Sequence, residues 1–220
     1  SELDFHPGGV RGQFHTPWGD SDFDLPLYGD FSVANTAAAL CVLCHSGVSL
    51  EAVVEAMGRL SPVPGRMEFF SGEPTLVVDY AHTPDALAKM LLACRPHVEG
   101  RLICICGCGG DRDRGKRPLM AAAACEHADR VWLTSDNPRS EDPQAIINDM
   151  LTGVPDDADV AVCADRLTAI QSAVESAVAG DLVVIAGKGH ETYQEVAGQR
   201  LPFDDRAIAR SLTHDKGGTA

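Results

Sequence analysis

From about residue 66 onward, short apolar runs alternate with stretches whose apolar residues recur at helical spacing. Five of these runs consist mainly of apolar residues: T-L-V-V-D, L-I-C-I-C, R-V-W-L-T-S, V-A-V-C and D-L-V-V-I-A. Strands without a polar face are typical of parallel sheets that helices cover on both sides. The pattern therefore predicts an α/β fold with a doubly wound, mostly parallel sheet.

The first sixty residues follow a different pattern. Alternating apolar positions between residues 10 and 25 predict short antiparallel strands. Two helical segments follow, and we expect Asn35 to cap one that runs to about His45 and Ser49 to cap the next. The run S-P-V-P-G at 61–65 then interrupts regular structure, so we expect a domain boundary there.

Prolines and capping side chains mark where the helices of the second region begin. The expected first turns lie at Thr83, Pro84, Pro118, Pro143 and Asp165. After the last apolar run, we expect a turn and then a final helix over about 205–213.

Charge and composition narrow the class of partner. The chain has 220 residues, with 18 Lys and Arg against 32 Asp and Glu, and its formal net charge of −14 opposes non-specific binding to nucleic acid or anionic membranes. No apolar run approaches the ~20 residues of a membrane helix, and no signal-peptide layout is present. We expect a cytoplasmic monomer that acts on small molecules, with no nucleic acid and no membrane insertion.

The eight cysteines lie mostly inside apolar segments. Cys104, Cys106 and Cys108 alternate along one run, and Cys41 and Cys44 are three positions apart in a helical pattern. Neither group is joined by a second C-x-x-C or by a suitably spaced histidine pair. We therefore expect reduced thiols packed in the core, and no metal ligands.

Residues 110–116 spell G-x-x-x-x-G-K, the skeleton of a phosphate-binding P-loop. Arg117 stands where Ser or Thr would hold magnesium, and Asp111 and Asp113 would bring negative charge to the phosphate oxygens. These departures argue against a P-loop. A phosphotransferase built on this loop stays an alternative that predicts magnesium-nucleotide binding.

Four polar motifs each follow an apolar run directly: D-Y-A-H-T-P at 79–84, G-C-G-G-D-R-D-R at 107–114, S-D-N-P-R at 135–139 and G-K-G-H-E at 187–191. The carboxyl ends of parallel strands emerge along one edge of a sheet, so we expect the motifs to converge there. Arginine grips carboxylates with a planar fork, and an acid accepts an ammonium group. The expected ligand is amino-acid-like, and its candidate contacts are His82, Arg112, Asp136, Asn137, Arg139, Lys188 and Glu191.

Individual residues also have simpler interpretations. Asp79 could hold a turn rather than a ribose, and His82 could cap a helix. Arg114, Lys116 and Arg117 could be solvated surface charges.

Several motifs together resemble the C-terminal part of the Mur ligase family. They are G-R-M-E at 65–68, D-Y-A-H-T-P, G-C-G-G-D-R-D-R-G-K-R-P, D-N-P-R, A-I-I-N-D-M-L and G-K-G-H-E, and the match runs from about Val10 to Leu212. The resemblance implies that residues 1–65 end the central ATPase domain and that 66–220 form the Rossmann-like, amino-acid-binding domain. The family's P-loop and UDP-binding domain are then expected upstream, so the chain alone should not catalyse.

The resemblance implies an ATP-dependent amide ligase of peptidoglycan synthesis, of the branch that adds meso-2,6-diaminopimelate to UDP-N-acetylmuramoyl-L-alanyl-D-glutamate through an acyl phosphate. Its amino-acid pocket would comprise Arg112, Asp136, Asn137, Pro138, Arg139, Gly187 and Glu191, with His82 and Lys188 as possible additional site residues. Lysine-adding relatives lack the arginine at position 139. Because diaminopimelate carries a second carboxylate, Arg139 is the expected specificity residue.

For the nucleotide, the resemblance implies ATP contacts at Asn35, Arg66 and Asp79, with Mg²⁺ ligands mostly upstream. Ser32 replaces an asparagine of the family pattern, which leaves a contact at that position in doubt. The segment 61–65 is the expected hinge for domain closure. Two alternatives remain open: a ligase for lysine or another diamino acid, and a non-catalytic module that binds an amino acid or nucleotide.

Overall fold

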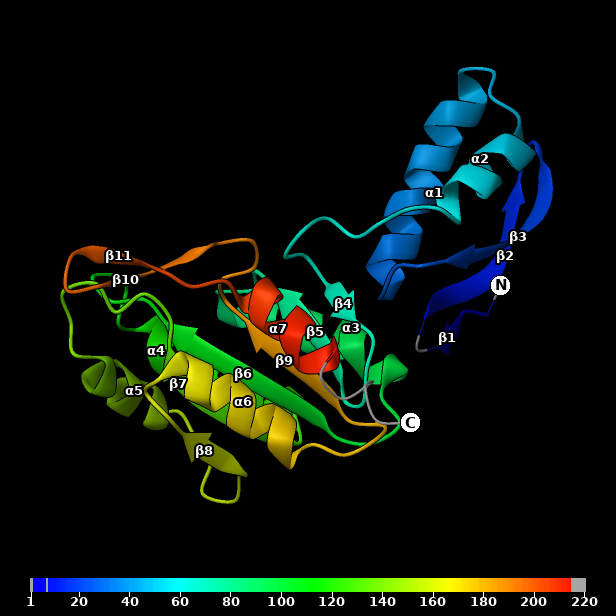
Figure 1. The fold of residues 1–220 in the computed structure, drawn as a ribbon. Coiled ribbons are helices and arrows are strands. Elements are labelled where there is room, and N and C mark those ends of the chain that lie inside the picture. Colours follow the sequence, from blue (N-terminus) through cyan, green and yellow to red (C-terminus); the bar gives the residue numbers. More distant parts are fainter. Residues whose placement is uncertain (1, 7, 215–220) are drawn as a thin grey trace. The chain divides into compact units, whose positions relative to one another are not determined.

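The computed structural model describes residues 2–6 and 8–214 (Figure 1). The chain divides into two compact units. Unit 1 is Ser1–Pro62 with Ala93–His97, and unit 2 is Val63–Leu92 with Val98–Ala220. Within the described residues, no helix combines the length and the apolar character needed to cross a membrane.

Unit 1 packs two helices against a three-stranded antiparallel sheet. The sheet has the order β1 (Asp4–His6), β2 (Gly9–Thr16) and β3 (Gly19–Leu25), and the helices are α1 (Asp30–His45) and α2 (Leu50–Met57). The core side chains come from alternate strand positions and from one face of each helix, and they include Val10, Phe14, Phe23, Leu40 and Val53. The antiparallel strands predicted from the alternating pattern are therefore present.

The start of α1 differs from the prediction. The helix begins at Asp30, after Gly29 with φ 81°, so Asn35 lies inside the helix as an exposed residue and caps nothing. Asp30 favours the earlier start because its carboxylate lies in the first turn, where the backbone N–H groups point, and it accepts the Phe31 N–H at 2.7 Å. Ser49 does cap α2, since its hydroxyl accepts the Ala52 N–H at 3.3 Å.

Unit 2 contains a six-stranded sheet. Its order is β4 (Glu68–Phe70), β5 (Thr75–Asp79), β9 (Leu182–Ala186), β6 (Leu102–Cys108), β7 (Arg130–Ser135) and β8 (Val160–Val162). Only β4 runs antiparallel; the other five strands are parallel to one another. The strand β9 stands between β5 and β6, although it is the last of the sheet along the chain.

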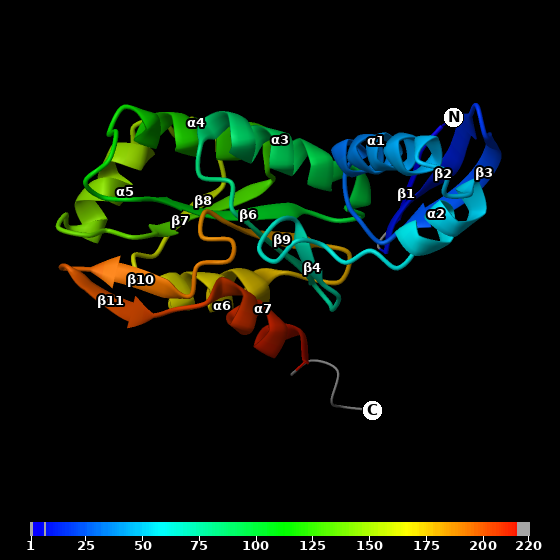
Figure 2. The same cartoon turned by 90° about the horizontal axis from the view of Figure 1, so that it is seen from above.

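Helices cover both faces of this sheet. Figure 2 shows α3 (Pro84–Cys94), α4 (Lys116–His127) and α5 (Pro143–Leu151) on one face, and α6 (Arg166–Ser176) and α7 (Asp205–His214) on the other. The change of face follows from the strand order, because the chain moves outward from β5 to β8 and then returns inward to β9. The predicted doubly wound, mostly parallel α/β fold is confirmed.

The side chains of β6 alternate between the two faces of the sheet. Ile103 and Ile105 join the core beneath α6, with Ile170 and Val174 from that helix. The alternate positions are the three cysteines 104, 106 and 108, which are also buried. All eight cysteines are free, but the expectation of packing fails for Cys41, which is exposed because it lies on the outer side of α1. Cys125 and Cys163 are only partly covered.

Most helix starts in unit 2 lie where the capping residues predict them. Thr83 accepts the Ala86 N–H, Asp142 caps α5 before Pro143, and Asp165 accepts the Thr168 N–H at 2.8 Å. Pro118 is the third residue of α4 rather than its start. Its missing N–H costs no helical hydrogen bond there, because N–H groups in a first helical turn have no partner within the helix.

The sequence did not predict the antiparallel edge strand β4, the hairpin after β9 or the short helix after α3. Where a turn was expected after β9, the chain forms an antiparallel hairpin of β10 (Tyr193–Val196) and β11 (Gln199–Pro202). A short 3-10 helix, η1 (Arg95–His97), also follows α3.

Candidate functional site

The four polar motifs do follow neighbouring strands. The strands β5, β9, β6 and β7 end at Asp79, Ala186, Cys108 and Ser135, and they lie in that order in the sheet. The loops after β9 and β7 lie on either side of the loop after β6. The candidate residues of unit 2 thus gather along one edge, the carboxyl edge of the parallel strands.

Three of these side chains form a hydrogen-bonded cluster. The Lys188 ammonium is fully buried and lies 3.2 Å from both Asn137 Oδ1 and Glu191 Oε2. Asn137 Nδ2 donates to the same Glu191 oxygen at 3.0 Å. A buried ammonium needs such a partner because desolvation strongly disfavours an unpaired charge. Lys188 thus holds Asn137 and Glu191 in fixed positions.

Asp136 lies beside this cluster, and its carboxylate has no hydrogen-bond donor among the described residues. Its residue is 9% exposed, and within the described part of the chain its side chain accepts no hydrogen bond. Burial raises the pKa of Asp136, while the positive charges of Arg166 and Lys188 oppose that rise. The carboxylate is therefore available to a cationic ligand group.

Gly187 lies against the Asp136 carboxylate. A Cβ at position 187 would come within 2.7 Å of Asp136 Oδ2, and the residue has a φ of 116°. Both the close approach and the backbone conformation favour glycine here.

Arg139 is restrained at both its backbone and its guanidinium. It has a φ of 53°, its N–H donates to Glu195 O at 2.9 Å, and Ala197 donates to its carbonyl at 2.7 Å. Nη1 donates to Gly110 O at 2.7 Å, and Nε lies 3.6 Å from Glu195 Oε2. Nη2 has no hydrogen-bond acceptor within residues 2–6 and 8–214, so this end of the fork can bind a carboxylate.

Arg112 and Pro138 complete the predicted pocket set. Arg112 is exposed on the loop after β6, and its guanidinium makes no hydrogen bond or ion pair in the described part of the chain. Pro138 is buried, and its carbonyl accepts the Glu141 N–H at 3.0 Å. Pro138 therefore shapes the loop, whereas Arg112 is an exposed cation at the edge of the site.

The P-loop-like segment is held by ion pairs. Arg117 is fully buried and donates to both carboxylate oxygens of Glu141, at 2.7 and 3.0 Å, and to Asp149 at 2.8 Å. The Arg117 hydrogen bonds lower the pKa of Glu141 to about 2. Arg117 is thus not a solvated charge, as one interpretation held. The Arg117 side chain can be buried because the Glu141 and Asp149 carboxylates compensate its positive charge.

Neighbouring charges of the same loop are also engaged. Arg114 pairs with Glu141 at 2.8 Å, and the Lys116 ammonium donates to the His82 carbonyl at 3.1 Å. Asp111 accepts from the Ser140 hydroxyl at 2.7 Å, which ties this loop to the one after β7.

The predicted nucleotide residues of unit 2 lie around Tyr80. The exposed Arg66 guanidinium is centred 4.6 Å from the Tyr80 ring, and the His82 and His190 rings lie 4.7 and 5.6 Å from it. This group offers a cation and ring faces, which suit a phosphate and a planar base. His82 is exposed, with Nδ1 2.9 Å from the Tyr80 carbonyl, so its ring is held within this group.

Asp79 holds a turn. Oδ1 accepts the Ala81 N–H at 2.7 Å and Oδ2 accepts the Met67 N–H at 2.8 Å. Burial raises the pKa of Asp79, although both hydrogen bonds oppose the rise. The remaining predicted residue, Asn35, belongs to unit 1. In the same helix, the Ser32 hydroxyl donates to Tyr28 O at 2.7 Å.

Four residues near the carboxyl edge escaped the sequence reading. Gln194 and Glu195 belong to the unpredicted hairpin, while Arg166 and Asp205 begin α6 and α7. Arg166 is buried and donates to Ser135 O at 3.2 Å and to Ala186 O at 3.0 Å. Asp165 signalled the helix start, but no pattern in the sequence indicates that the arginine after it is buried.

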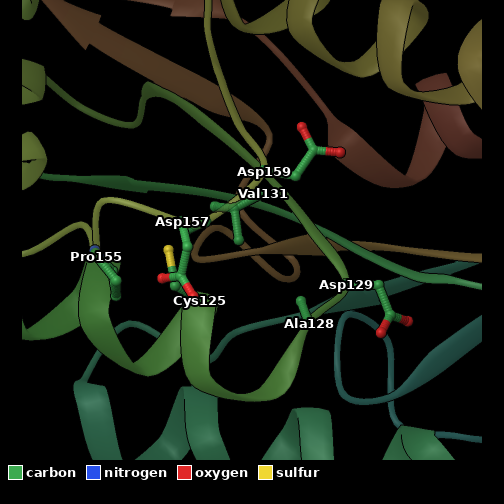
Figure 3. A pocket seen from close by; sticks show the side chains of 8 residues that line it. Cys125, Ala128, Asp129, Val131, Pro155, Asp157 and Asp159 are labelled. Atoms are coloured by element: carbon green, nitrogen blue, oxygen red, sulfur yellow. The ribbon is translucent and has the colours of Figure 1, made fainter.

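A pocket of about 280 Å³ lies at the opposite edge of the sheet (Figure 3). Its lining includes Cys125 from α4, Asp129 and Val131 at the start of β7, and Asp157 and Asp159 before β8. Asp129 is engaged in the fold, since its Oδ2 accepts the Leu102 N–H at 2.7 Å. None of the predicted site residues lines this pocket.

Residues 65–189 match the family model described as Mur ligase, glutamate ligase domain. The chain belongs to the Mur ligase family. The resemblance first seen in the motifs is thereby confirmed.

Individual Mur ligases show how far the similarity extends. The chain is 46% identical over 220 residues to UDP-N-acetylmuramoyl-L-alanyl-D-glutamate–2,6-diaminopimelate ligase of Trichormus variabilis, covering 98% of the chain and 44% of that relative. It is 50% identical over 222 residues to the protein of the same name from Parasynechococcus marenigrum, again covering 98% and 44%. The chain thus spans less than half the length of these relatives.

Solved structures of Mur ligases agree in fold. One of a UDP-N-acetylmuramoyl-L-alanyl-D-glutamate–2,6-diaminopimelate ligase matches all of this chain and 45% of its own, with a TM-score of 0.82 at 44% identity. The UDP-N-acetylmuramate-alanine ligase of Thermotoga maritima matches with a TM-score of 0.68 at 18% identity, covering 100% of this chain and 46% of its own. The second likeness concerns the fold alone.

Proposed function

We propose that the protein carrying this chain is an ATP-dependent amide ligase that adds meso-2,6-diaminopimelate to UDP-N-acetylmuramoyl-L-alanyl-D-glutamate. Residues 1–65 would end the ATPase domain, and residues 66–220 would form the domain that brings the amino acid. The names of the relatives support this proposal. The single observation that carries it is the arrangement at Asp136 and Arg139.

The arrangement suits an amino acid with two charged ends. The buried Asp136 carboxylate has no hydrogen-bond donor in the described part of the chain, and it would accept an ammonium group. Arg139 follows three residues later with Nη2 free to bind a carboxylate. Lysine has no carboxylate at its side-chain end, so it would leave this guanidinium without its partner, a cost of about 1.5–3 kcal/mol.

The other pocket residues have supporting roles in this proposal. Lys188 fixes Asn137 and Glu191. Glu191 Oε1, which accepts no hydrogen bond in the described part of the chain, would be the atom of this cluster that meets the ligand. Gly187 leaves room beside Asp136. Arg112, on the loop after β6, would bind a carboxylate of the ligand.

The proposed reaction forms one amide bond. The D-glutamate carboxylate, activated as an acyl phosphate, is attacked by the free amine of diaminopimelate; the C–N bond forms, the amine loses a proton, and phosphate leaves. This chain would contribute orientation of the amine, which in favourable cases is worth about 7–11 kcal/mol of the barrier. Closure about residues 61–65 would bring the amine to the acyl carbon.

For ATP, Arg66 would meet a phosphate, and Tyr80 would lie beside it. Asp79 would act mainly through the turn that positions Met67 and Ala81. Asn35 would contribute from unit 1. The Mg²⁺ ligands would lie mostly upstream of this chain, and among the described residues no group of three or more His, Cys, Asp or Glu side chains is placed to hold a metal ion.

The test is amide ligation by the full gene product with meso-diaminopimelate or L-lysine as the acceptor. We expect strong preference for meso-diaminopimelate, and a loss of about 10- to 200-fold in its kcat/KM for Arg139→Ala, equivalent to the free energy of one charged hydrogen-bonded group. Arg59→Ala is the matched control, because Arg59 is an exposed arginine whose one ion-pair partner among the described residues is Glu55. Equal use of lysine by the wild type, or unchanged preference in Arg139→Ala, would contradict the proposal.

A further inference from the structure

The β10–β11 hairpin makes a series of contacts with the segment 135–139. Arg139 donates its N–H to Glu195 O, Ala197 donates to Arg139 O, and Glu195 N donates to Asn137 Oδ1 at 2.8 Å. Arg139 also forms an isolated parallel bridge with Val196. The hairpin therefore lies along this segment and is joined to it by one isolated bridge and by the hydrogen bonds around it.

Gln194 adds two side-chain hydrogen bonds to this series. Its Nε2 donates to Asp136 O at 2.7 Å and to Ser135 Oγ at 3.0 Å. The Ser135 hydroxyl in turn donates to Ala164 O at 2.7 Å, before α6. One carboxamide thus fixes the backbone at the point where β7 ends and the candidate site begins.

The hairpin contributes little to the hydrophobic core. Each residue of β10 is only partly covered, and each residue of β11 is exposed. A two-stranded hairpin is marginally stable by itself in water. The contacts that hold this one are directed largely at the segment 135–139, so its main effect falls on the site rather than on global stability.

We propose that Gln194 is a positioning residue for amino-acid binding. By holding Asp136 O and the Ser135 hydroxyl, it fixes the Asp136 carboxylate and the Asn137 amide relative to Arg139. The identity of the bound amino acid rests on the proposed function, whereas the positioning role does not. Gln194 itself acts through the backbone and does not touch the reacting atoms.

The experiment compares Gln194→Ala and Gln194→Glu with the wild type in the full gene product. Alanine removes both hydrogen bonds, and glutamate places a carboxylate oxygen against the Asp136 carbonyl. We expect the KM for meso-diaminopimelate to rise about tenfold in Gln194→Ala and further in Gln194→Glu, with kcat within about twofold and the KM for ATP unchanged. Gln199→Ala is the matched control, because this exposed glutamine of the same hairpin makes no side-chain hydrogen bond in the described part of the chain.

Hydrogen exchange provides a readout that needs no substrate. The Arg139 amide donates to Glu195 O, so its exchange should accelerate roughly tenfold in Gln194→Ala if the hairpin loosens from the segment. Amides of β6 should keep their wild-type rates.

Three outcomes overturn the positioning role: an unchanged KM for the amino acid, an equal rise in the KM for ATP, or unchanged exchange at Arg139 in Gln194→Ala. Failure of the proposed function is seen separately, as a wild-type protein that does not ligate meso-diaminopimelate. In that case, the exchange rate at Arg139 still decides the role of Gln194.

Discussion

Removing one partner of the buried ion pair between Arg166 and Asp205 should cost far more stability than removing one partner of an exposed pair. Arg166 Nε lies 3.0 Å from Asp205 Oδ1, Nη2 lies 2.7 Å from Oδ2, and both side chains are 0% exposed. The same guanidinium donates to the carbonyls of Ser135 and Ala186, where β7 and β9 end. Removal of the Asp205 charge would leave the buried Arg166 cation without its ion-pair partner, and among the described residues only the charge of Asp136, which makes no hydrogen bond to it, would still oppose the cost of burial.

Asp205→Asn is the perturbation, since the amide keeps the side-chain shape and removes the charge. Breaking a buried pair by removing one partner costs about 3–5 kcal/mol, and we expect a loss of unfolding free energy in that range. The matched control is Glu55→Gln. Glu55 pairs with Arg59 four residues later on the surface, where the side chains are 74% and 67% exposed, so the loss there should be about 0.3–0.5 kcal/mol.

Urea unfolding of the 220-residue chain at neutral pH measures both losses, with tryptophan fluorescence and circular dichroism followed together to detect separate transitions of the two units. The ion pair and its control belong to different units, so each loss should appear in its own transition. A loss below about 1 kcal/mol for Asp205→Asn would refute the reasoning, because it would mean that the cation finds water or another partner.

Two further predictions concern the same edge of the sheet. The pKa of Glu141 is lowered to about 2 from its usual 4.5, so its contribution to stability is present above pH 4.5 and is lost as the pH falls toward 2; Glu141→Gln should flatten this part of the urea-derived stability profile, and parallel wild-type and variant profiles would contradict it. Gly187→Ala should destabilise by about 1 kcal/mol or more, because a Cβ would meet Asp136 Oδ2 at 2.7 Å as well as strain the backbone. Gly198→Ala is the control, because Gly198 also has a positive φ, 75°, but a Cβ there would meet no atom within 4 Å. Equal losses of stability in the two variants would show that the contact with Asp136 is unimportant.

The parts of the fold that sequence predicts well are those with a repeated physical signal. Apolar runs predicted the five parallel strands, and Pro143 and Asp165 predicted the starts of two helices. The prediction that Asn35 caps a helix was wrong, because asparagine is also tolerated inside a helix. The carboxylate of Asp30 favours an earlier helix start, because it lies in the first turn near the free backbone N–H groups.

The hairpin and the buried charges lack such a signal. The strands β10 and β11 have no buried face, so no alternation of apolar and polar positions marks them. Arg117 and Arg166 resemble surface residues in sequence, because their acidic partners Glu141 and Asp205 lie 24 and 39 positions away. The candidate site could be located at the carboxyl edge from strand ends alone, but the residues that hold its side chains in place could not.

The position of β9 has a consequence for how the chain acquires its structure during synthesis. Strands β5 and β6 pair with β9 and not with each other, so the sheet remains in two separate pieces until residues 182–186 have left the ribosome. Each piece exposes an unpaired apolar strand edge in the interval, and such edges recruit other chains. A nascent chain of this protein therefore has its greatest need of chaperone protection in the interval after β5 and β6 have emerged and before β9 does.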